Sequence, residues 1–127
     1  MTDDELDLVY RVSQHPLWQW RDGMLGVQVS PDTVWASDLK FSRFLEGKNL
    51  SGFGPSTRDP YTVYLIWKDL SRFNLNGCSI VRAYEDGVYK AGFKRGKNKA
   101  LLLYTSFQEG KVAVRMWLWC ASKNING

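Results

Sequence analysis

Histidine and cysteine are scarce in this chain. Its 127 residues include one histidine, His15, and two cysteines, Cys78 and Cys120. So few histidine and cysteine side chains argue against a structural zinc site. They also leave no conventional pairing of a histidine with a serine or cysteine nucleophile. The phosphate-binding motif G-x-x-x-x-G-K-[ST] and the metalloprotease motif H-E-x-x-H are both missing. We therefore predict no catalytic residues, no metal site and no cofactor, and hence a protein that is not an enzyme.

Long apolar runs are missing too. No stretch approaches the roughly 20 apolar residues that span a bilayer. The opening MTDDELDLVY is acidic where a secretory signal would be basic and then apolar. These features predict a cytoplasmic protein without a membrane partner, in which both cysteines stay reduced and unlinked. A composition of 44% hydrophobic and 24% charged residues is ordinary for a globular protein, and the length fits one domain, 1–127.

Charge is unevenly divided along the chain. Residues 1–60 contain 6 basic and 9 acidic side chains, a net charge of −3, whereas residues 61–127 contain 11 and 4, a net charge of +7. The positive charge is concentrated in KAGFKRGKNK, residues 90–99, which contains no acid. Such a run suits contact with phosphate, and it equally suits a solvated hairpin tip.

A helix is predicted at the N-terminus. Thr2 and Glu5 match a capping box, and the acidic first turn suits the helix dipole. The helix should end near Gln14, because Pro16 disfavours helical geometry at the residue before it. Three apolar side chains fall on one face at helical spacing: Leu6, Val9 and Tyr10.

The middle of the chain predicts a hairpin, a short helix, a loop and a longer helix. Residues 24–30 and 33–39 flank Pro31-Asp32, which suits a tight turn. Residues 40–49 match a short helix ending at Gly47, and residues 49–60 are typical of a loop. Asp59 and Pro60 then match an N-cap followed by proline at the first helical position. The helix that they open has an apolar stripe of Val63, Ile66, Trp67, Leu70 and Phe73.

The C-terminal half predicts a meander and then an ambiguous segment. Residues 78–85 and 88–94 flank Asp86-Gly87, a strong hairpin signal, and residues 99–106 match a third strand. In residues 106–123, the alternation from Val112 to Cys120 favours a strand, whereas Ser106 and Glu109 match the capping box of a helix. Pattern alone leaves the two interpretations nearly even.

The stretch HPLWQWRDGM, residues 15–24, resembles a motif, H-P-x-W-x-W-x-x-G-M, of small bacteriophage and prophage proteins that have no established activity. The resemblance implies an order of elements: an N-terminal helix, a β segment, a helix opened by Asp-Pro, short strands and a C-terminal helix. It favours the helical interpretation of residues 106–123. The basic hairpin and the tryptophan-rich end of this chain depart from that pattern.

Together these elements predict an α+β fold. An antiparallel β-sheet, made of a hairpin plus a meander, is covered mainly on one face by N-terminal, central and C-terminal helices. The apolar arc of the C-terminal helix is too wide for a surface helix that packs on one side only. We therefore expect part of it to meet a second copy or another protein.

Aromatic side chains supply the main candidates for binding. In the motif, Trp18 and Trp20 alternate in an extended segment and should point to opposite faces, while His15 could hydrogen-bond a carbonyl of the last helical turn. The interpretation that this motif is structural is favoured over one in which its tryptophans bind a partner. The candidate anchors for a partner protein are Trp117, Trp119, Trp18 and Trp20.

The predicted function is that of a small phage-type accessory protein that binds a host or phage protein, for example as an inhibitor of a host process or defence system. One alternative is nucleic-acid binding through the basic hairpin, with phosphate contacts from Lys90, Lys94, Arg95, Lys97 and Lys99. Sequestration of a small ligand is a second alternative. A homo-oligomer is compatible with each of these functions.

Overall fold

Three α-helices and six short strands make up the part of the protein that a computed structural model describes, residues 3–29 and 40–124. A short 3-10 helix extends the second α-helix. The elements follow the order α1 (Asp3–Gln14), β1 (Leu25–Gln28), β2 (Phe41–Arg43), β3 (Phe53–Pro55), α2 (Pro60–Asp69), η2 (Leu70–Arg72), β4 (Cys78–Glu85), β5 (Val88–Arg95), β6 (Leu101–Ser106) and α3 (Glu109–Lys123).

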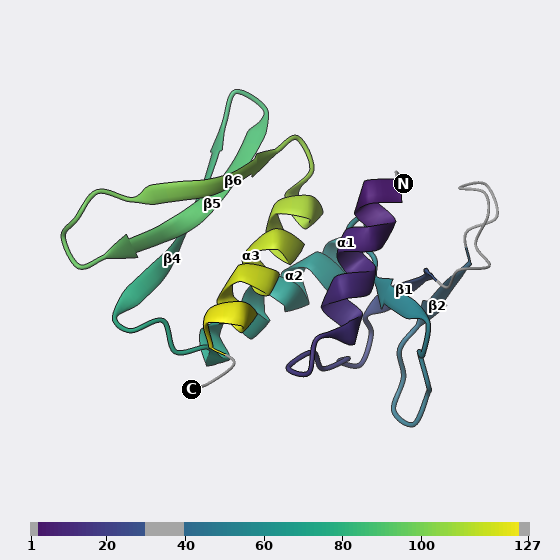
Figure 1. The fold of residues 1–127 in the computed structure, drawn as a ribbon. Helices are drawn as coiled ribbons and strands as arrows, with labels where there is room; N and C mark the ends of the chain where they lie inside the picture. The colour runs from purple at the N-terminus through teal and green to yellow at the C-terminus, as the bar shows by residue number, and fades with distance from the viewer. Residues whose placement is uncertain (1–2, 30–39, 125–127) are drawn as a thin grey trace.

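The strands form two separate antiparallel sheets with the helices between them (Figure 1). In the first sheet the strand order is β2-β1-β3, and in the second it is β4-β5-β6. In Figure 1, α3 lies against the second sheet, and α1 lies between α3 and the first sheet. The predicted α+β fold, with antiparallel strands and three helices at these places in the chain, is confirmed. The sequence pattern did not predict the division into two sheets.

Helix α1 ends at Gln14, as the proline rule predicts. Its buried face differs from the predicted one, because Tyr10 is exposed. The Glu5 side chain is buried and lies near the hydroxyl of Thr57 and the guanidinium of Arg58. Thr2, its predicted capping partner, lies outside the described residues. The buried face therefore consists of Glu5, Leu8, Val9 and Val12.

Two local predictions are confirmed in detail. The Asp59 carboxylate caps α2, accepting hydrogen bonds from the Thr62 amide at 3.1 Å and the Thr62 hydroxyl at 2.6 Å, with Pro60 opening the helix. Asp86 and Gly87 form the two-residue turn between β4 and β5, and both have positive φ, 54° and 79°. These angles belong to a type I′ turn, whose twist matches that of the strands that it joins.

The prediction of a short helix in residues 40–49 is wrong. Residues 41–43 form β2, which pairs with β1, and the Phe44 amide donates to the Met24 carbonyl at 2.7 Å. The predicted loop 49–60 also contains a strand, β3, on the other side of β1. Strand pairing with β1 supplies hydrogen bonds that a local pattern cannot reveal. The predicted strand 33–39 lies outside the described residues.

Helix α3 confirms the helical interpretation of the C-terminal segment, but not its capping box. Gln108 is the N-cap residue and makes no side-chain cap, whereas the Ser106 hydroxyl accepts from the Gln108 amide at 3.1 Å. The expectation that α3 needs a second molecule is also wrong. Contacts with α1, α2, β5 and β6 cover its wide apolar arc within one chain. Its fully buried residues include Val112, Val114, Met116, Trp117 and Cys120.

Gly110, in the first turn of α3, permits a close approach of the chain at Thr57. A Cβ at this position would lie 1.8 Å from the Thr57 carbonyl oxygen, although Gly110 has an ordinary helical backbone. We expect Gly110→Ala to destabilise the fold by about 1–3 kcal/mol, although alanine favours helices by about 1 kcal/mol.

Urea unfolding followed by circular dichroism measures this effect. The control is Ser122→Ala in the exposed last turn of α3, which should change stability by less than about 0.5 kcal/mol. A Gly110→Ala protein as stable as the wild type would contradict the close approach.

Candidate functional site

Trp117 is not a surface anchor, which corrects its candidacy for partner binding. The side chain is completely buried in the centre of the core. Its indole N–H donates to the Asp69 carboxylate at 2.8 Å. The rings of His15, Trp18 and Phe73 meet it edge-on, with centroids 5.3–5.7 Å away. Trp117 therefore belongs to the core.

The HPLWQWRDGM stretch packs against this core. Trp18 and Trp20 do not point to opposite faces, as was predicted, because their rings meet edge-on with centroids 5.4 Å apart. The segment is irregular rather than a strand, so the two-residue alternation does not apply. Trp20 also stacks on Phe44. Both tryptophans are half-buried, in keeping with the structural interpretation of the motif.

His15 uses its imidazole differently from the prediction. Nδ1 accepts a hydrogen bond from the Leu17 amide at 3.1 Å, instead of a ring N–H donating to a carbonyl of the last helical turn. Burial lowers the pKa of His15, and the nearby Arg72 guanidinium lowers it further. Both effects favour the neutral imidazole that this acceptor role requires.

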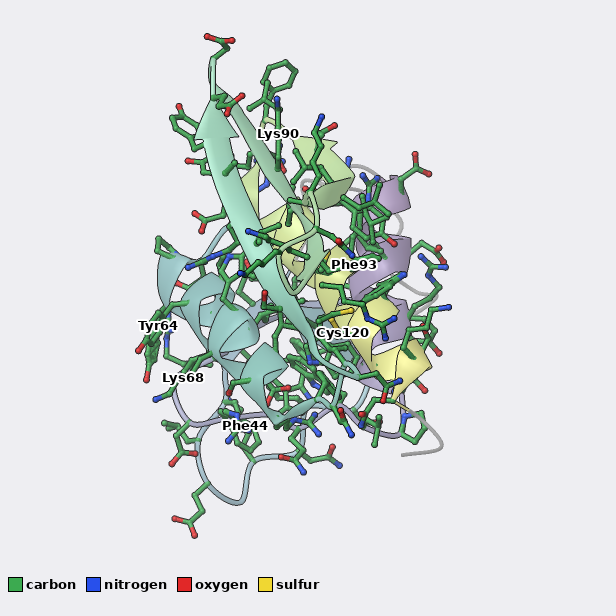
Figure 2. All side chains as sticks on the ribbon, turned by 90° about the vertical axis from the view of Figure 1, so that its left-hand side faces the viewer. Phe44, Tyr64, Lys68, Lys90, Phe93 and Cys120 are labelled. Carbon is green, nitrogen blue, oxygen red and sulfur yellow. The ribbon has the colours of Figure 1, made fainter. Side chains whose placement is uncertain are left out.

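Trp119, the remaining tryptophan candidate, connects α3 to the second sheet. Its ring stacks on Phe93 of β5 with centroids 4.9 Å apart, and Lys123 lies 5.9 Å from its centroid. Figure 2 shows Phe93 next to α3, on the side where Cys120 lies. The indole is half-buried by these contacts, so only part of it faces solvent.

The predicted phosphate-binding residues do not form one cluster. Lys90 pairs with Glu85 at 3.4 Å near the β4–β5 turn, and Arg95 donates to the Asn76 carbonyl at 3.1 Å. Lys94, at the other end of β5, and Lys97 and Lys99, in the β5–β6 turn, have no side-chain partner within the described ranges. Lys90 is thus apart from the other four cations, which lie at the opposite end of the second sheet.

The sequence analysis missed a groove between α2 and β4. A cavity of about 530 Å³ lies there. Tyr64, Trp67 and Lys68 line it from α2, and Ile80 and Arg82 line it from β4. Figure 2 faces this side of the molecule and shows Tyr64 and Lys68 on α2, with β4 crossing beside the helix.

One edge of β4 is open along this groove. Glu85 and Val88 flank the two-residue turn and therefore form a hydrogen-bonded pair with each other. Because such pairs alternate along the strand, the backbone groups of Ile80, Arg82 and Tyr84 point away from β5. Within residues 3–29 and 40–124, these groups make no backbone hydrogen bond to another element. The groove thus has an unpaired strand edge as one wall.

Trp67, Arg82 and Glu109 form a cluster in the middle of the groove. The Arg82 guanidinium lies over the Trp67 ring, 4.7 Å from its centroid. The Trp67 indole N–H donates to Glu109 Oε1 at 3.1 Å, and Arg82 Nη1 is 4.0 Å from the same oxygen. The cation–π contact and the carboxylate together hold the guanidinium over the indole.

Two further cavities adjoin this cluster. One of about 450 Å³ is lined by Tyr89, Phe107 and Arg58, and another of about 330 Å³ is lined by Tyr84 and Lys90. Trp67 and Arg82 line all three cavities, so the cluster separates compartments of one groove. Phe107 is 79% exposed at its rim.

The described residues include no group of three or more histidine, cysteine, aspartate or glutamate side chains that could hold a metal ion. Cys78 and Cys120 are free thiols. Burial raises the pKa of Cys120 to about 12, so this thiol stays protonated at neutral pH. Aromatic side chains, cationic side chains and a strand edge line the groove.

Comparison of the chain with protein-family models, curated proteins and solved structures finds no match. None of the helices in the described ranges is long and apolar enough to traverse a bilayer.

Proposed function

We propose that this protein acts without catalysis, by binding an extended segment of another protein in the groove between α2 and β4. The observation that carries this proposal is the open edge of β4 beside a cavity of about 530 Å³. An extended segment can add to such an edge as a further strand. Main-chain hydrogen bonds then supply affinity, and pockets for alternate side chains supply specificity.

The aromatic lining of the groove supports the same proposal. Tyr64 is 58% exposed, Phe107 is 79% exposed, and Trp67 is held in place by Glu109 and Arg82. Exposed aromatic rings are enriched among the residues that dominate protein–protein binding, because they bury much area at low entropic cost. The aromatic rings of the groove lie on the same side of the molecule as the open edge of β4. One occupant could therefore contact both the rings and the β4 backbone groups.

The resemblance of the HPLWQWRDGM stretch to phage and prophage proteins supports a host or phage protein as the partner. A role as a cytoplasmic inhibitor of a host process or defence system is the finer form of the proposal. Nucleic acid is the second candidate. The observation that favours it is the group of Lys94, Lys97 and Lys99, which lack side-chain partners within the described part of the chain.

Strand addition predicts a specific pattern of amide protection. Peptides selected from a displayed library of random heptapeptides provide the probe. We expect a bound peptide to slow hydrogen exchange at the Ile80 and Arg82 amides, because these N–H groups would donate to the added strand. The amides of Val81 and Ala83 already face β5, so their exchange should change little. NMR-detected exchange measures each amide separately.

Two matched variants test whether a side chain that fills the groove blocks peptide binding. Ser71→Trp adds a large side chain at the cavity, and Ser122→Trp adds the same side chain on α3, away from the groove-lining residues. Both serines are exposed and donate to the carbonyl three residues earlier, at 2.9 and 2.8 Å. We expect Ser71→Trp to weaken peptide binding at least tenfold, roughly 1.4 kcal/mol, and Ser122→Trp to leave it unchanged. Slowed amide exchange that is confined to β6, or equal effects of Ser71→Trp and Ser122→Trp on peptide affinity, would refute the proposal.

A further inference from the structure

We infer that the groove selects an extended segment that carries a carboxylate and a large apolar side chain two positions apart. This inference rests on the proposed function, because it names the chemistry of the segment that adds to β4. It follows from three properties of the groove: an apolar end, a cationic end and the two-residue spacing between them.

The apolar end lies around Ile80. Leu70, Phe73 and Leu75 line the same cavity as Ile80. Leu70 and Phe73 are largely buried, and Leu75 and Ile80 are half-buried against the core, so the floor is fixed by packing. A large apolar side chain placed opposite Ile80 would remove this remaining apolar surface from water, which favours binding.

The cationic end lies at Arg82. Among the described residues, the lining of the cavity of about 530 Å³ includes two cations, Lys68 and Arg82, and no carboxylate. Glu109 is near Arg82, but the guanidinium is 4.0 Å from its Oε1, and that oxygen already accepts from the Trp67 indole. Arg82 therefore retains N–H donors for a second acceptor. The Trp67 ring, its centroid 4.7 Å from Cζ, restrains the guanidinium, and a restrained guanidinium suits a bidentate bond to a carboxylate.

The spacing follows from strand geometry. Ile80 and Arg82 are two residues apart on β4, so their side chains lie on the same face. In a strand added to the β4 edge, the residues opposite them are also two apart and point to that face. The segment therefore carries its carboxylate opposite Arg82 and its apolar side chain opposite Ile80. A parallel and an antiparallel segment present the two groups in opposite order.

A peptide fits these features better than a nucleic acid. Aromatic rings and cations would suit a single-stranded nucleic acid. The open backbone edge of β4, however, offers alternating N–H and C=O groups that match a polypeptide. Lys94, Lys97 and Lys99 lie outside the residues that line the groove. A mixed-sequence single-stranded DNA therefore serves as the contrasting probe.

The sequences selected from the random heptapeptide library give the first test. We expect enrichment of aspartate or glutamate two positions from an aromatic or large aliphatic residue. In the best peptide, replacement of the acid by its amide should weaken binding to the wild type by about tenfold or more, as expected for the loss of a charge-assisted bond. Fluorescence anisotropy of a labelled peptide measures both affinities.

The variant Arg82→Gln tests whether Arg82 is the residue that recognises the carboxylate of the peptide. We expect this variant to bind the acidic and the amide peptides with affinities within about twofold of each other, because the partner of the carboxylate is gone. Arg82→Lys keeps the charge without the planar fork and should restore part of the discrimination. The control is Lys97→Gln, which removes one positive charge in the β5–β6 turn and should leave the discrimination intact.

The outcomes separate this inference from the function on which it rests. Protection of the Ile80 amide by peptides without an acid preference, or equal loss of discrimination in Arg82→Gln and Lys97→Gln, would overturn the inference and leave strand addition standing. Selection of no binding peptide, together with tight binding of the single-stranded DNA, would overturn the proposed function as well.

Discussion

Replacing Trp117 with alanine is expected to destabilise the protein by about 3–5 kcal/mol, the range measured for large-to-small substitutions of buried aromatic residues. Trp117 is the largest fully buried side chain among the described residues. Its removal leaves a cavity between the rings of His15, Trp18 and Phe73, and it leaves the Asp69 carboxylate without one of its donors. Urea unfolding, followed by far-ultraviolet circular dichroism, measures the change.

Trp119→Ala is the matched control, because it removes the same side chain from a half-buried site two positions along the same helix. We expect it to cost less than half as much, since part of the Trp119 ring is already in water and its loss opens no closed cavity. Equal costs for the two variants, or a Trp117→Ala protein within about 1 kcal/mol of the wild type, would contradict the core position of Trp117.

The second large effect is expected at Asp69, whose side chain is almost completely buried at the end of α2. Its carboxylate accepts hydrogen bonds from Arg21 at 2.7 Å, from Arg72 at 2.9 Å and from Trp117 at 2.8 Å. We expect Asp69→Ala to destabilise the fold by about 3–5 kcal/mol, because it leaves an indole N–H and two cations without their partner. Asp69→Asn should cost less, since its amide oxygen can still accept from Trp117.

The surface pair formed by Asp7 and Arg11 provides the control. Both side chains are mostly exposed, and the pair spans 3.8 Å, so Asp7→Ala should cost less than about 1 kcal/mol. Urea unfolding of Asp69→Ala, Asp69→Asn and Asp7→Ala at neutral pH compares them directly. An Asp69→Ala protein no less stable than Asp7→Ala would refute the role given to the buried carboxylate.

Asp69 also makes stability depend on pH. Burial alone would raise the pKa of Asp69, but the hydrogen bonds from Arg72, Trp117 and Arg21, together with the Arg72 charge, lower it below its ordinary value. The unfolded chain therefore binds a proton at Asp69 before the folded protein does. The stabilisation is complete above the unfolded pKa, near 3.9, and is lost as the pH falls through the lower folded value. The stability gap between wild type and Asp69→Asn should narrow in urea titrations at acid pH.

Local signals predicted the helix ends and the turn, because their geometry depends on residues that are adjacent in the sequence. Asp59-Pro60 opens α2, Asp86-Gly87 turns β4 into β5, and α1 ends before Pro16. The strand β2 could not be predicted in this way. Its three residues are defined by pairing with residues of β1 that lie 14 to 18 positions earlier along the chain. Short segments of this kind take their conformation from partners that a local pattern does not identify.

Sequence patterns could not predict the candidate site, for a related reason. Trp67, Arg82 and Glu109 come from three elements and meet only in the folded chain. Trp67 was predicted as part of an apolar stripe, and its exposed edge at the groove carried no separate signal. The burial of Trp117 could not be foreseen either, because it depends on α3 being covered from several sides. Composition identified aromatic residues as the candidates but could not tell exposed ones from buried ones.

The Asp69 network has a consequence for the order in which the chain assembles. Arg21 and Trp117 each lie 48 positions from Asp69, on opposite sides in the sequence. A state in which α2 has met only one of these segments would hold a carboxylate partly removed from water with an incomplete set of donors, which costs several kcal/mol. Half-assembled states are therefore penalised, and the HPLWQWRDGM stretch, α2 and α3 should gain their native contacts in one cooperative step.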